Sequence, residues 1–71
     1  MTLYELCYLA KIQGNIRISM WRGEEELVIA KFEACEQLFS GYIDDEWIDL
    51  VVDYIFCPGD GWLHIEVKEE E

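Results

Sequence analysis

The spacing of apolar residues changes near residue 15, and this change limits the fold more than any other feature of the sequence. Before it, apolar side chains recur at helical spacing, at Leu3, Leu6, Cys7 and Ala10. Thr2 stands before this stripe and Glu5 follows three residues later, which is a capping box. The pattern predicts a helix over residues 3–12, ended by Gly14-Asn15.

After residue 15 the apolar side chains alternate, with Ile16, Ile18 and Met20 on one side and Arg17, Ser19 and Trp21 on the other. Residues 22–25 form a turn signal, and residues 26–32 are rich in Val and Ile. These two runs predict an antiparallel hairpin. A short helix over residues 34–39, ending near Ser40-Gly41, is expected next because its apolar residues return to helical spacing.

The apolar residues within 44–56 fit both the helical period and the alternation of a strand. As a helix, the segment would begin at an Asp44 cap; as a strand, its apolar residues would alternate from Trp47 onward. Its β-branched and aromatic content favours the strand. The turn at residues 57–61 and the clear alternation of residues 62–68, with Leu63, Ile65 and Val67 facing inward, complete a second predicted hairpin.

The sequence therefore predicts an α+β fold with the order N-terminal helix, β-hairpin, short helix, β-hairpin. We expect a four-stranded, mostly antiparallel sheet with the first helix packed on one face. We expect residues 1–71 to form a single domain, with residues 69–71 as a frayed acidic tail. A chain of this length buries only about 60% of the surface that its unfolded form exposes. Because 52% of the residues are hydrophobic, some apolar side chains are expected to remain outside.

Charge is the second constraint. The chain has sixteen acidic and five basic residues, a formal net charge of −11, yet its apolar content argues against disorder. Residues 24–71 alone carry −13. Such a charge argues against direct binding to nucleic acid or to an anionic membrane, since that affinity comes from Lys and Arg. It also exceeds the roughly 2–8 charges that solubility asks of a small domain. We therefore expect a basic protein partner.

Two kinds of residue are candidates for this partner-binding site. The carboxylates expected to contribute are Glu24, Glu25, Asp44, Asp45, Glu46, Asp49 and Asp53. Trp47 and Trp62 are the expected aromatic anchors, because Trp is enriched at interface hot spots. Strand parity places both of them, with Trp21, on the face opposite the aliphatic residues. The alternative is that these rings form a second small core under the short helix and the loops.

Catalytic and metal-binding residues are not expected. Cys7, Cys35, Cys57 and His64 lack the C-x-x-C spacing of a zinc site, and the acidic residues lack the pattern of a calcium loop. His64 falls on an outward strand face, where a pair with Cys57 is conceivable but lacks the other parts of a catalytic site. We expect no enzyme activity and no cofactor. An odd number of cysteines and the lack of a signal peptide or membrane span favour a reducing cytoplasm.

Three segments carry a family resemblance: Met1-Thr2-Leu3-x-Glu5-Leu6, Ile16-Arg17-Ile18-Ser19-Met20 and Asp60-Gly61-Trp62-Leu63-His64-Ile65-Glu66-Val67. With them the chain resembles small acidic proteins encoded by phages and mobile elements of Gram-positive bacteria. Some of those are anti-CRISPR proteins, which mimic nucleic acid and block the basic channel of an effector nuclease. The resemblance implies a phage-encoded inhibitor acting in the bacterial host cell. The alternative is a structural homo-oligomer, for instance a homodimer, or an adaptor subunit that assembles through its Trp-bearing face or a strand edge.

Overall fold

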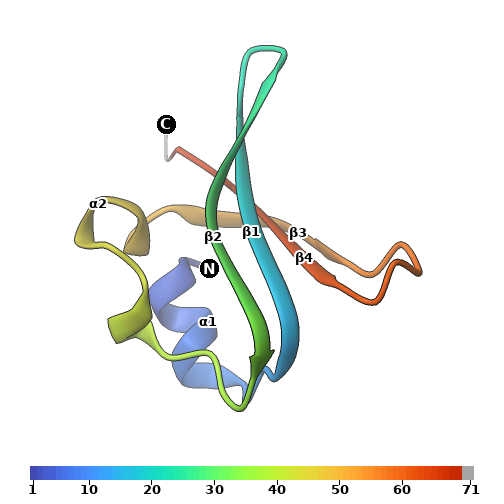
Figure 1. Cartoon of the computed structure of the whole chain (residues 1–71). Helices are drawn as coiled ribbons and strands as arrows, with labels where there is room; N and C mark the ends of the chain where they lie inside the picture. The colour runs from blue at the N-terminus through green and yellow to red at the C-terminus, as the bar shows by residue number, and fades with distance from the viewer. Residues whose placement is uncertain (70–71) are drawn as a thin grey trace.

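Four strands form one mixed sheet in the computed structural model, which describes residues 1–69 (Figure 1). Their bounds are Gly14–Arg22 for β1, Glu25–Cys35 for β2, Val51–Phe56 for β3 and Leu63–Lys68 for β4. The strand order is β2-β1-β4-β3. The outer pairs β1–β2 and β3–β4 are the two predicted antiparallel hairpins, and the central pair β1–β4 is parallel. The α+β class and the order of the elements are therefore confirmed, with a sheet that is mixed.

Helix α1 spans Leu3–Leu9 and begins at the predicted capping box. The backbone N–H of Glu5 donates to Oγ1 of Thr2 at 3.2 Å, and the N–H of Thr2 donates to Oε1 of Glu5 at 3.1 Å. The helix ends earlier than predicted, because Ala10 already has an extended backbone. Residues 10–13 instead connect α1 to β1, and the carbonyl of Ile12 accepts a bond from Leu38 N–H at 2.7 Å.

The helix predicted over residues 34–39 is wrong. Strand β2 continues to Cys35, which pairs with Gly14 at the start of β1. That pairing extends β2 beyond residue 32, where the strand was predicted to end. Residues 34 and 35, the start of the expected helix, therefore belong to the strand. A 3-10 turn, η1, follows at Ser40–Tyr42. Leu38, which contributed to the helical spacing of this segment, is instead buried from a loop.

Residues 44–56 contain both of the structures that their sequence allows. Helix α2 spans Asp45–Ile48, and β3 begins three residues later, so the preference for strand is wrong for the first part of the segment. A shift in the pairing of β3 with β4 then alters the alternation. Val52 lies opposite Val67, whereas after the shift it is Ile55 that lies opposite Ile65.

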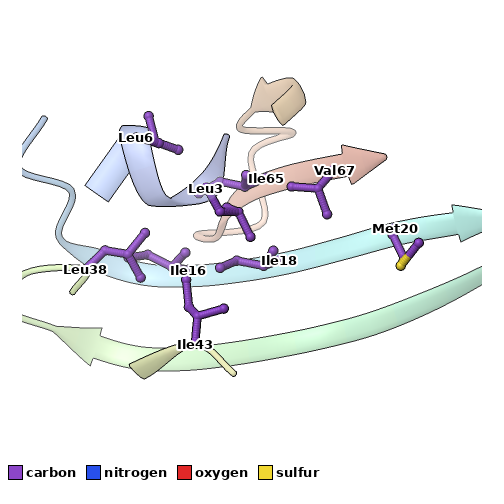
Figure 2. Close-up of a cluster of buried hydrophobic side chains, with 9 residues drawn as sticks. All are labelled: Leu3, Leu6, Ile16, Ile18, Met20, Leu38, Ile43, Ile65 and Val67. Carbon is purple, nitrogen blue, oxygen red and sulfur yellow. The ribbon is translucent and has the colours of Figure 1, made fainter. Parts of the chain in front are cut away.

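The hydrophobic core joins all parts of the chain (Figure 2). Its fully or almost fully buried members are Leu3, Leu6, Ile16, Ile18, Met20, Leu38, Ile43, Ile65 and Val67. Ile16, Ile18 and Met20 of β1 and Ile65 and Val67 of β4 thus face inward as predicted, whereas Leu63 is only partly buried and lies outside this cluster. Helix α1 adds Leu3 and Leu6. Ser19, on the other side of β1, is 1% exposed, and its hydroxyl has no hydrogen-bond partner within residues 1–69.

Candidate acidic interface

The strand order gathers carboxylates at one end of the sheet. Since β1 and β4 run parallel, both finish at the same end, where the antiparallel strands β2 and β3 begin. We call this region the acidic end and define it as residues 22–25, 44–49, 53 and 68–69. It holds two cations and eight carboxylates. The carboxylates belong to Glu24, Glu25, Asp44, Asp45, Glu46, Asp49, Asp53 and Glu69.

Helix α2 turns its apolar residues inward and its carboxylates outward. Trp47 and Ile48 pack against the hydrophobic core, while the carboxylates on either side of them are exposed. Those exposed residues are Asp44, Asp45, Glu46 and Asp49. The predicted position of Trp47 on the outer face of the sheet is therefore wrong, because this ring belongs to a helix and not to an alternating strand.

The turn between β1 and β2 carries Glu24, and Glu25 begins β2; both are exposed. Gly23 has a φ of +65°, a left-handed backbone that glycine adopts without strain, and so allows the chain to reverse here. Arg22, at the end of β1, connects this turn to its neighbours. Its guanidinium carbon lies 6.0 Å from the centre of the Trp47 ring, and Nη2 lies 3.9 Å from Oε1 of Glu69.

Arg22 was missed by sequence reasoning. Nothing in the local sequence around residue 22 shows that α2 and the end of β4 lie beside it, because that neighbourhood depends on the strand order. Its role is structural as well as electrostatic. A cation over an aromatic ring within about 6 Å is attracted by the ring face, so this contact holds the β1–β2 turn near α2.

The acidic end keeps most of its charge unneutralised. Its second cation, Lys68, places Nζ 3.6 Å from Oδ1 of Asp53. Among residues 1–69, no Lys, Arg or His nitrogen lies within 4.0 Å of a carboxylate of the remaining six acids. Those six are Glu24, Glu25, Asp44, Asp45, Glu46 and Asp49. Such a concentration of one sign raises the local potential and attracts oppositely charged surfaces.

Asp49 and Asp53 are four residues apart, a spacing that would place them on one face of a continuous strand or helix. The structure separates them between two elements. Asp49 caps the C-terminus of α2, and Asp53 lies at the pairing shift of β3 beside Lys68. Asp49 therefore belongs to the unpaired carboxylates, whereas Asp53 is already engaged.

Trp62 lies away from the acidic end, just before the start of β4. Its ring is partly buried, and Nζ of Lys31 lies 4.7 Å from the ring centre. Trp21 is 50% exposed, and its indole N–H donates to Oε1 of Glu66 at 3.3 Å. The enclosed second core that was the alternative for these rings is not formed around Trp21. Their neighbours are charged side chains of the sheet itself.

The single histidine makes a local contact in the β3–β4 hairpin. Nε2 of His64 lies 2.9 Å from Oδ2 of Asp60, and the His64 ring stacks on Phe56 at 5.2 Å between centres. The bonds from His64 and from the Trp62 N–H hold the pKa of Asp60 below its ordinary value of 3.8. Within residues 1–69, no three His, Cys, Asp or Glu side chains gather closely enough to hold a metal ion.

Comparisons of the chain with protein-family models, with curated proteins and with solved structures found no match. We therefore infer the function from the geometry of the chain itself. None of the helices in the described part of the chain is long and apolar enough to cross a membrane.

Proposed function

We propose that this chain is a non-enzymatic binding protein whose acidic end occupies a basic surface of a partner protein. The observation that carries the proposal is the gathering of eight carboxylates at one end of the sheet against two cations, both already engaged. The surfaces with which proteins hold nucleic acids are rich in Lys and Arg, because they must neutralise phosphates. Such basic surfaces are therefore complementary in charge to the acidic end.

The way the carboxylates are held suits them to binding. Asp45 and Glu46 lie on a helix that Trp47 and Ile48 fix to the core. Side chains carried by an ordered backbone lose less conformational freedom on binding than those of a loose tail. Complementary charge chiefly speeds association and selects among partners. We therefore assign the specific contacts to α2 and the β1–β2 turn.

More specifically, we propose that the chain is a phage-encoded inhibitor of a bacterial defence nuclease. It is supported by the resemblance to small acidic anti-CRISPR proteins and by the charge of the chain. The mechanism is occlusion, in which the acidic end covers the Lys and Arg side chains that would otherwise hold nucleic acid. Such an inhibitor needs no catalytic group, and it competes directly with the nucleic acid.

A competition measurement tests this function. Basic bacterial nucleases, CRISPR effectors among them, are each bound to a fluorescently labelled nucleic acid, and the chain is added while anisotropy is followed. We expect displacement from at least one nuclease, with an affinity that falls by about tenfold or more between about 0.05 and 0.5 M salt, because salt screens charge. Failure to displace nucleic acid from any member of the panel would contradict the proposal. Displacement that is insensitive to salt would contradict its electrostatic basis.

A further inference from the structure

The outer edge of β3 is paired along only part of its length. The backbone N–H of Leu3 donates to the carbonyl of Leu50 at 2.9 Å, and the N–H of Val52 donates to the carbonyl of Met1 at 2.7 Å. Thr2 and Val51 form an antiparallel bridge between these bonds. The start of this edge therefore already carries an added antiparallel segment.

Beyond Val52 the outer edge is open. Within residues 1–69, β4 is the only strand that pairs with the rest of β3. The open stretch is bounded on one side by the segment that pairs with Val52. On the other side lies Pro58, which has no N–H to donate to a ladder. The open window is thus residues 53–57, centred on Ile55.

This window exposes large apolar side chains. Tyr54 is 62% exposed, Ile55 47% and Phe56 41%. Asp53 is the single charged residue in the window, and Lys68 lies beside it. Proteins usually protect a strand edge with charges, proline, bulges or a covering segment. In the described part of the chain, no such protection covers the three exposed apolar residues.

The other edge of the sheet is protected. Strand β2 carries charged side chains on both sides of the apolar run 27–30, and its pairing with β1 is irregular at two places, one of them within that run. The charged residues are Glu25, Glu26, Lys31 and Glu33. Bulges and charges of this kind discourage pairing with another strand. The outer edge of β3 is therefore better suited than the edge of β2 to pairing with another strand.

We propose that residues 53–57 pair antiparallel with the same residues of a second copy of this chain, about a two-fold axis at Ile55. Ile55 then lies opposite its own counterpart, and Tyr54 lies opposite Phe56 of the other copy on the same face. Asp53 lies opposite Cys57, so no two like charges face each other. Two four-stranded sheets become one continuous sheet, and the contact is the same on both copies, as two-fold symmetry requires.

Charge limits the orientation in which a second copy can approach. With a net charge of −11, two copies repel each other across most of their surfaces, whereas residues 54–59 carry no charge. Strand β3 begins at the acidic end. Antiparallel pairing of two β3 strands therefore sends the two acidic ends in opposite directions, which keeps their repulsion small. Apart from Asp53, the carboxylates of both acidic ends lie outside the paired window.

Disulfide trapping tests the predicted register. Residues directly opposite in an antiparallel pair have Cα atoms about 4.5–5.5 Å apart, which falls within the range of about 4.4–6.8 Å that a disulfide spans. The variant Ile55→Cys is made together with Cys57→Ser, which removes the exposed native thiol. Under mild oxidation we expect it to form a covalent dimer. The matched control is Val28→Cys in the same background, an exposed position of similar exposure on β2, which we expect to cross-link several-fold more slowly.

The unmodified chain supplies an independent readout. Light scattering after size exclusion should show a mass that rises from one copy toward two with concentration, and Ile55→Lys should stay at one copy. The proposal is overturned if the unmodified chain stays monomeric at every concentration, or if Ile55→Cys cross-links no faster than Val28→Cys.

This inference does not depend on the proposed function. Self-association is measured on the purified chain, without nuclease or nucleic acid. A monomeric chain that displaces nucleic acid would overturn the edge proposal alone, and a dimer that displaces none would overturn the function alone.

Discussion

Leu3 and Leu9 lie in the same short helix but in opposite environments. Leu3 is fully buried in the core, and Leu9 is 71% exposed. Replacing a buried leucine by alanine removes apolar contacts and leaves a cavity, at a cost of about 2–5 kcal/mol. We therefore expect Leu3→Ala to lower the free energy of unfolding by that amount in urea titrations. Leu9→Ala, the matched control, should change it by no more than about 0.5 kcal/mol; equal losses would contradict the core described above.

Asp60 gives a prediction of pH dependence. Its pKa is lowered in the folded chain, first by the bond from His64. A lowered folded pKa means that this contact stabilises the fold fully above the ordinary pKa of 3.8 and is lost as pH falls through the folded value. We expect His64→Leu to move the Asp60 midpoint upward in a carbon-13 NMR titration of the carboxyl group. An unchanged midpoint would show that His64 does not set this pKa.

At the residue scale, contacts between residues close in the sequence could be predicted, whereas contacts between residues far apart in the sequence could not. The bonds between Thr2 and Glu5 follow from their spacing alone. The position of Trp47 was wrong because parity applies only inside a strand, and residue 47 belongs to α2. The contact of Arg22 with Trp47 joins residues 25 positions apart, and no local pattern encodes it.

At the scale of elements, α1 depends on its cap. It has seven residues, so most of its backbone N–H groups fall in the first turn, where a helix supplies no acceptor. The Thr2 hydroxyl accepts one of these bonds. We expect Thr2→Ala to cost about 0.5–2 kcal/mol in thermal unfolding, and Thr2→Ser to keep most of the stability. If the serine variant is as unstable as the alanine variant, the hydroxyl is not what holds the cap.

The two hairpins could be predicted because each joins neighbouring segments through a turn with its own sequence signal. The helix expected over residues 34–39 could not be excluded locally, because its apolar spacing is helical while its first residues are held by pairing with β1. The parallel pairing of β1 with β4 has no local signal at all. It joins residues 16–20 to residues 63–67, and it depends on packing of the whole core.

At the scale of the whole molecule, the acidic end exists only because of that parallel pair. The acidic residues could be read from the sequence, but their gathering could not. The opposite end of the sheet also carries acids, with Glu33 and Glu36 exposed near the end of β2. The same number of carboxylates can therefore be replaced by lysine at either of two places, one inside the proposed interface and one outside it.

The most direct test of the acidic interface is the nucleic-acid displacement assay, carried out with two double variants of equal charge. Asp45→Lys with Glu46→Lys alters α2, and Glu33→Lys with Glu36→Lys alters the far end of β2; each pair changes the net charge from −11 to −7. We expect the α2 pair to abolish displacement and the β2 pair to retain most of it, with circular dichroism confirming that both remain folded. Equal loss in the two variants would show that only total charge matters and would contradict a localised acidic interface.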